Sequence, residues 1–198
     1  MRWKKFLLKY RDLSYVNVLH DILILATAFL LVFLQATFTP IRSVFGAQLD
    51  LLPSLMVYTS LTGGVTSFTL LAVFGGLWLD SLSANPLGAS VLPLFLIGFI
   101  IQKYRGLILR EQLFAQFMLG LGASAAAPLA SLAIVANLDA HPLVGWFFIW
   151  QWIVMSIGGA LVTPVWFWIF DRLLLALSYR PLNEPSFRPD REIKRGRS

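Results

Sequence analysis

Apolar residues fall along this chain in six long runs, which are separated by short polar or basic segments. A helix needs about 20 apolar residues to cross a bilayer, with a range near 17–25. The runs lack the two-residue alternation that strands of a membrane barrel show. The pattern therefore predicts an all-α integral membrane protein, folded as a six-transmembrane-helix bundle. The predicted spans are residues 19–38, 49–61, 65–82, 86–102, 113–136 and 144–170.

The second run is short and carries Pro53 near its start. Proline is tolerated in the first turn of a helix, where its missing amide has no intrahelical partner. A helix of this length either crosses only partly or crosses where the bilayer thins. Thr62-Gly63-Gly64 follows and predicts a tight turn into the third run.

Composition agrees with a membrane location. The 198 residues are 58% hydrophobic and 13% charged, whereas a soluble domain has about 45–50% and 25%. We therefore expect one membrane domain, residues 19–178, after a basic cytoplasmic segment, residues 1–18. The proline-rich, charged tail, residues 179–198, is predicted to be disordered. Its basic end either only sets the topology or also contacts anionic lipid.

The positive charges predict the orientation. With six crossings and the N-terminus inside, all of the 16 Lys and Arg residues except Arg42 lie on the cytoplasmic side. Such a bias is typical of a chain with both ends in the cytoplasm. It also accounts for the net charge of +6, so nucleic acid is not an expected partner. The first run resembles a signal peptide, but its small residues lie inside the apolar stretch, which favours an uncleaved span.

Groups that could perform chemistry are few. The chain has no cysteine, and its two histidines, His20 and His141, lie far apart in the sequence. No predicted span interior holds Lys, Arg, Asp, Glu or His, which proton pumps and ion-coupled carriers need at mid-depth. We find no acid–base pair, nucleophile with its base, or phosphate-binding loop. The expectation is a protein that is not an enzyme and has no metal and no cofactor.

The most informative stretch is FGGLWLDSLSANPLG, residues 74–88, which places Asp80 at the end of an apolar run. A carboxylate at a membrane edge is unfavourable unless it caps, pairs or binds something. Asp80 is expected at a helix C-terminus, where the helix dipole disfavours it. Amides of the turn at residues 81–85, or an ion pair with Arg42, would stabilise it. Three roles stay open: a structural staple of the turn, a partner-binding residue or a ligand-binding residue.

Small residues predict close helix packing in the last two spans. Gly120 and Ser124 are four residues apart, as are Gly159 and Thr163. Such faces let membrane helices approach closely, because packing drives their association in lipid. We expect internal packing here; a docking face for another protein is the alternative.

The order of these features resembles the rod-shape-determining protein MreD family, over roughly residues 15–178. The matching positions are Pro53, Gly75-Gly76, Asp80, Pro86-Leu87-Gly88 and the basic loop at Lys103-Tyr104-Arg105. The resemblance implies a non-catalytic scaffold of the cell-elongation machinery, in the bacterial inner (cytoplasmic) membrane. Implied partners are MreC and, in a larger complex, MreB, RodA and a class B penicillin-binding protein, together with membrane lipids. The implied structural or partner-binding residues are Asp80, Gly75, Gly76, Pro86, Gly88, Pro53 and Arg42.

The chain departs from the family at two points. Ser54 follows Pro53 where members often have Asp or Asn, with Asp50 before it, and the tail after Tyr179 is longer than expected. The family also resembles, in fold, the substrate-binding membrane subunits of energy-coupling-factor vitamin transporters. Such a subunit is the alternative function. Those subunits carry an Ala-x-x-x-Ala seam in the first span, whereas no two of Ala26, Ala28 and Ala36 are four apart here, which weighs against this alternative.

The predicted topology can be tested directly, because the chain has no native cysteine to interfere. Single cysteines at Ser43 and Asp139 should react with an impermeant thiol reagent in intact cells. Cysteines at Gly106 and Ser186 should react only after lysis. Labelling at Gly106 from outside would refute six crossings and favour five.

Overall fold

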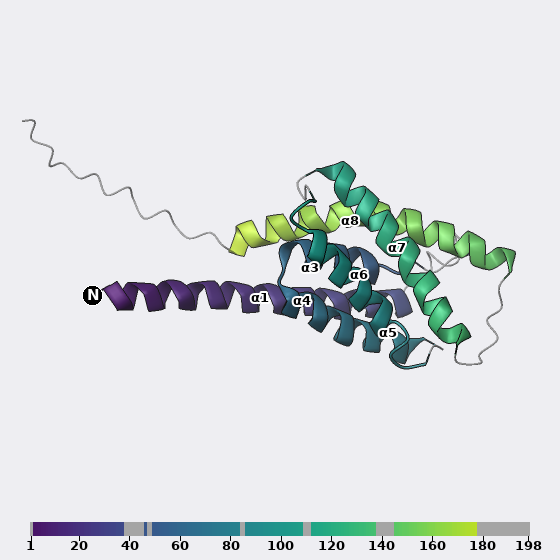
Figure 1. The fold of residues 1–198 in the computed structure, drawn as a ribbon, viewed down its shortest axis with the longest axis horizontal. Helices are drawn as coiled ribbons and strands as arrows, with labels where there is room; N and C mark the ends of the chain where they lie inside the picture. Colours follow the sequence, from purple (N-terminus) through teal and green to yellow (C-terminus); the bar gives the residue numbers. More distant parts are fainter. Residues whose placement is uncertain are drawn as a thin grey trace, which may run out of the picture.

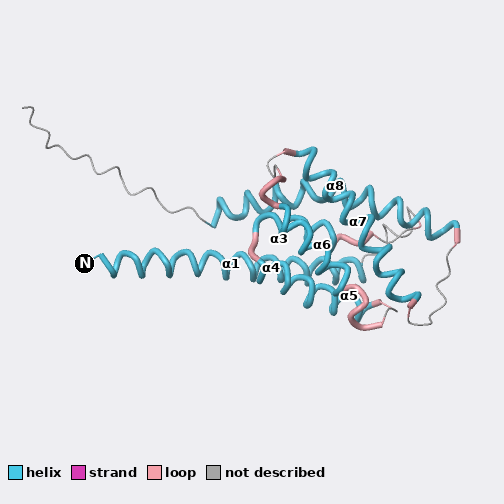
Figure 2. Tube along the Cα trace, in the orientation of Figure 1, coloured by secondary structure: helices cyan, strands magenta, loops and turns pink. Residues whose placement is uncertain are grey.

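The computed structural model describes residues 2–37, 46, 49–83, 86–108, 112–137 and 145–177, with side chains from residue 18 onward. Within these ranges the chain is helical and has no strand, as Figure 2 shows. The elements are α1 (Arg2–Thr37), α3 (Leu52–Thr62), α4 (Val65–Leu70), the π-helical turn η1 (Leu71–Gly75), α5 (Gly76–Leu82), α6 (Val91–Tyr104), α7 (Leu113–Ala136) and α8 (Trp146–Leu177). The predicted all-α class is confirmed.

Four helical stretches are long and apolar enough to cross a membrane: Val18–Thr37, Val65–Leu82, Leu113–Ala136 and Trp146–Ala176. The second of these comprises α4, η1 and α5. Large apolar side chains such as Phe29, Phe74 and Trp168 lie exposed on them, where lipid would cover them. The chain is therefore a multi-pass membrane protein. Because α3 has 11 residues and α6 has 14, a count of six crossings stays a prediction.

Two predicted boundaries differ from the observed helices. The N-terminal segment, residues 1–18, is not separate from the first span, because α1 runs without a break from Arg2 to Thr37. Its first half projects from the bundle (Figure 1). Pro86 does not open the next helix either, since α6 begins at Val91 and residues 87–90 form a turn. The tail at residues 179–198 lies outside the described residues.

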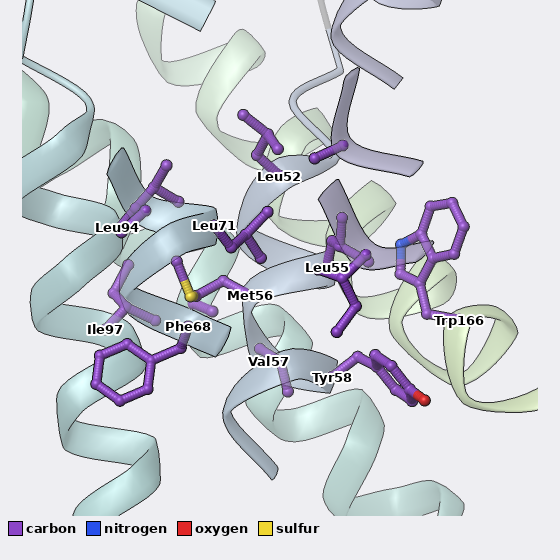
Figure 3. Close-up of a cluster of buried hydrophobic side chains, with 14 of the residues drawn as sticks. Leu52, Leu55, Met56, Val57, Tyr58, Phe68, Leu71, Leu94, Ile97 and Trp166 are labelled. Carbon is purple, nitrogen blue, oxygen red and sulfur yellow. The ribbon is translucent and has the colours of Figure 1, made fainter. Parts of the chain in front are cut away.

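The short helix α3 lies at the centre of the bundle. Every residue from Leu52 to Leu61 is buried, and α3 contacts α1, α4, η1, α6, α7 and α8. Figure 3 shows Leu55, Met56 and Tyr58 of α3 inside this apolar cluster, with Trp166 of α8 on one side. A helix that is apolar on all faces must be covered on all faces. The other elements therefore form a shell around α3.

Polar side chains of α3 are satisfied without water. The hydroxyls of Ser54, Thr59 and Ser60 donate to the carbonyls of Leu51, Leu55 and Met56 at 2.7–2.9 Å. Ser54 Oγ also accepts from the indole N–H of Trp166 at 3.0 Å. Because buried polar groups are unfavourable when they lack partners, these bonds make the central position of α3 possible.

Helices α7 and α8 pack tightly against each other through small residues. A Cβ on Gly120 of α7 would collide with Thr163, and a Cβ on Gly159 of α8 would collide with Ser124. Ser124 and Thr163 are themselves buried. The predicted seam of Gly120, Ser124, Gly159 and Thr163 is thus confirmed as internal packing between α7 and α8.

A larger residue at the seam should destabilise the bundle. We expect Gly159→Leu to lower the midpoint of thermal unfolding in detergent. Overfilling a well-packed contact typically reduces the free energy of unfolding by about 1–3 kcal/mol. Gly122→Leu is the matched control, since a Cβ on Gly122 of α7 meets nothing within 4 Å. Equal midpoints for the two variants would contradict the seam.

Candidate functional site

The carboxylate of Asp80 joins the end of α5 to the start of α6. Asp80 is 1% exposed, and its Oδ2 accepts hydrogen bonds from the backbone N–H groups of Gly88 at 2.8 Å and Ser90 at 3.1 Å. Bonds to a charged acceptor are stronger than neutral ones. We call this arrangement of Asp80, Gly88 and Ser90 the Asp80 clamp.

Two described donors, Gly88 and Ser90, lie beyond the predicted turn at residues 81–85. Residues 84–85 of that turn lie outside the described residues. Gly88 has φ +94°, in the left-handed region that glycine tolerates best. This conformation lets the turn present both amides to one oxygen. The alternative partner, Arg42, lies outside the described residues, so the ion pair stays a prediction.

Two glycines let the neighbouring elements approach the clamp. A Cβ on Gly76 would lie 2.9 Å from the Cα of Val91, the first residue of α6. A Cβ on Gly75 would lie 3.3 Å from Cδ2 of Leu52, the first residue of α3. Gly75 ends the π-helical turn η1, a feature that the sequence did not indicate. Gly75 and Gly76 therefore let α3 and α6 pack closely against the stretch formed by α4, η1 and α5.

Two further predicted site residues, Pro53 and Pro86, have different surroundings. Pro53 is buried in the first turn of α3, as predicted. Pro86 is exposed, and its carbonyl accepts from the N–H of Ala89 at 3.1 Å. Pro86 thus shapes the turn that carries Gly88 rather than starting a helix.

Asp50 precedes α3 and begins it. Its Oδ1 accepts from the N–H of Leu52 at 3.0 Å, which satisfies an amide that has no intrahelical partner. Asp50 thus supplies an acceptor at the start of α3.

A cavity of about 430 Å³ opens beside Asp50 and the clamp. We call it the Asp50 cavity. Its wall includes polar or aromatic side chains from five elements or their flanking loops: Gln35, Asp50, Ser83, Ser90, Ser131, Phe148, Gln151 and Trp152. Both amide atoms of Gln35 and Oδ1 of Asp80 are buried without a hydrogen-bond partner. Gln35, Asp50 and Gln151 are far apart in the sequence, and only the tertiary fold brings them to one cavity.

A second cavity, of about 800 Å³, lies at the other end of α3. We call it the Asp21 cavity. Ser67 donates to Asp21 Oδ1 at 2.5 Å, and His20 Nε2 lies 3.3 Å from the Tyr58 hydroxyl. Asp171 of α8 also lines it. His20 and Asp21, which the sequence placed at a membrane boundary, thus form specific contacts with α3 and α4.

A scan against known families, a search of curated proteins and a search of solved structures all give no match. Among the described residues, no group of three or more His, Cys, Asp or Glu side chains could hold a metal ion. The Asp80 clamp and the two cavities are therefore the candidate sites, and each must be interpreted from its own chemistry.

Loss of the Asp80 carboxylate should destabilise the protein. Asp80→Ala would leave the amides of Gly88 and Ser90 without an acceptor, at about 1–3 kcal/mol for each. Asp80→Asn should be milder, because its carbonyl oxygen can still accept both bonds. Asp171→Ala is the control; Asp171 is exposed, and a surface change typically stays within about 0.5 kcal/mol.

The measurements are membrane abundance and the midpoint of thermal unfolding. If an ion pair with Arg42 dominates instead, Asp80→Asn should be as harmful as Asp80→Ala, and Arg42→Ala should reproduce the loss. Wild-type abundance and stability for Asp80→Ala would show that the clamp is not needed.

Proposed function

We propose that this protein is a non-catalytic scaffold of the bacterial cell-elongation machinery, of the MreD type. The observation that carries the proposal is the Asp80 clamp. Its residues, Asp80 and Gly88, together with Gly75 and Gly76, belong to the one stretch that carries the family resemblance. Each of them has a structural role at a single junction between α3, α5 and α6. This supports a motif that maintains a shape rather than one that performs a reaction.

The proposed location is the bacterial inner membrane, with six crossings and both ends in the cytoplasm. Successive helices support this topology, because their ends alternate between the two ends of the bundle. Gln35, Leu79 and Val135 meet at the Asp50 cavity, whereas Thr62, Leu113 and Leu174 meet at the Asp21 cavity. Arg105 joins the Asp21 end, since its guanidinium donates to the carbonyl of Gly63 at 3.0 Å.

The proposed partners follow from the resemblance: MreC, and with it RodA, a class B penicillin-binding protein and MreB. We expect these partners to contact the lipid-facing surface of the bundle. The described helices offer extensive apolar surface for this purpose, including Phe29, Phe74 and Trp78 beside one another on α1, η1 and α5. Phe29 and Trp78 have ring centroids 4.7 Å apart.

One observation favours the alternative, a substrate-binding subunit of a vitamin transporter. The Asp50 cavity has a volume of about 430 Å³, within the range of small-molecule sites. The missing Ala-x-x-x-Ala seam in α1 weighs against this reading. We therefore keep the scaffold as the proposal and let one experiment separate the two.

Depletion of the protein should make rod-shaped cells round, because lateral wall synthesis would lose a membrane component. A tagged chain purified in mild detergent should retain MreC, and Asp80→Ala should retain less of it than Asp171→Ala at equal membrane abundance. Unchanged cell shape together with impaired uptake of a vitamin would overturn the scaffold and favour the transporter subunit.

A further inference from the structure

Acidic and polar side chains line the Asp50 cavity. Asp50 lines the cavity, and so does Ser90, whose backbone N–H bonds to the Asp80 carboxylate. No Lys, Arg or His is among the lining residues that the structure describes. Oxygen atoms of Ser83, Ser90 and Ser131 add further hydrogen-bond acceptors. Among the described residues at this cavity, carboxylates therefore have no cationic partner, and this favours a positively charged occupant.

Unsatisfied polar atoms indicate hydrogen bonds that a ligand would complete. Both polar atoms of the Gln35 amide and Oδ1 of Asp80 are buried without a partner. A buried polar atom without a partner is unfavourable by about 1–3 kcal/mol. Such atoms are uncommon in folded proteins, and each requires an explanation. Occupation of the cavity by a hydrogen-bond donor would explain Gln35.

Aromatic rings at the same cavity narrow the class of ligand. Phe148 and Trp152 line it, and the Trp152 indole N–H donates to the carbonyl of Ala125 at 2.9 Å. This bond holds the ring in place while the ring remains part of the wall. Aromatic faces attract organic cations, and carboxylates accept bonds from ammonium groups. The volume of about 430 Å³ accommodates a small organic molecule or a lipid headgroup.

We propose that the Asp50 cavity binds a primary ammonium group, with Asp50 as its charged partner and Gln35 as a hydrogen-bond partner. The group belongs either to a small soluble amine or to the headgroup of phosphatidylethanolamine. This site is independent of the scaffold function proposed above. An Asn oxygen can also accept from the Leu52 amide, so Asp50→Asn removes the charge beside the cavity while it keeps an acceptor at the start of α3.

Cysteine chemistry tests the proposal, because the chain has no native cysteine. Ser131→Cys places a thiol in the cavity wall, and Asn137→Cys places one on an exposed turn at the end of α7. Both variants, purified in detergent, would react with an ammonium-bearing and a sulfonate-bearing methanethiosulfonate. We expect the ammonium-to-sulfonate ratio of rates to be at least about tenfold higher at Ser131→Cys than at Asn137→Cys.

Adding Asp50→Asn to Ser131→Cys should reduce this ratio to that of Asn137→Cys, whereas adding Asp171→Asn should leave it unchanged. Asp171 is a carboxylate of the other cavity, so it controls for net charge. Met155→Cys, which also lines the cavity, replaces Ser131→Cys if that variant does not fold. Equal ratios at the cavity and the exposed turn, or a ratio insensitive to Asp50→Asn, would overturn the proposal.

Protection experiments identify the source of the ammonium group. Labelling of Ser131→Cys in phosphatidylglycerol vesicles would be repeated with soluble ethanolamine, or with phosphatidylethanolamine in the bilayer. Slower labelling with ethanolamine supports a soluble amine, and slower labelling only with the lipid supports a headgroup. Adding Gln35→Leu should weaken either protection. Absence of protection by both would overturn the site without affecting the scaffold function, which is tested by cell shape and MreC binding.

Discussion

The whole structure depends on one constraint: every backbone polar group at membrane depth must find a partner inside the protein. The short helix α3 meets this constraint from the centre of the bundle. Its 11 residues are too few to reach both surfaces of an ordinary bilayer, yet its ten residues from Leu52 to Leu61 are all buried. The other helices cover its sides, and its two ends lie at the Asp50 cavity and the Asp21 cavity. The amide of Leu52 at one end and the carbonyl of Gly63 at the other are both satisfied by side chains.

The Asp80 clamp meets the same constraint at the connection between α5 and α6. The turn at residues 86–90 lies against the buried Asp80 near the end of α5, and the amide of the buried Ser90 cannot rely on water. One carboxylate oxygen satisfies two of them, and Gly76 lets Val91 approach at a distance that a side chain would forbid. The motif therefore combines an acceptor, a left-handed glycine and a small contact residue. The carboxylate satisfies the turn amides, the left-handed glycine lets the turn present them, and the small residue lets the turn pack closely.

Sequence reasoning predicted the elements that depend on local pattern and missed those that depend on packing. The long apolar runs correspond to α1, α7 and α8, and the small-residue seam was found from its four-residue spacing. The start of α6 was wrong by five residues, since the amides of Gly88 and Ser90 bond to Asp80 instead of entering a helix. The π-helical turn and the Asp50 cavity were not anticipated. Gln35, Asp50 and Ser131 are far apart in the sequence, and only the tertiary fold brings them together.

Ser90 connects the cavity to the clamp. Its backbone N–H bonds to Asp80, and the same residue lines the Asp50 cavity. Asp50 likewise serves two places, because one oxygen begins α3 while the residue lines the cavity. A cation in the cavity would therefore lie beside residues that organise α3 and α6. Since a ligand stabilises the conformation that binds it, occupation of the cavity would stabilise the junction between α3, α5 and α6.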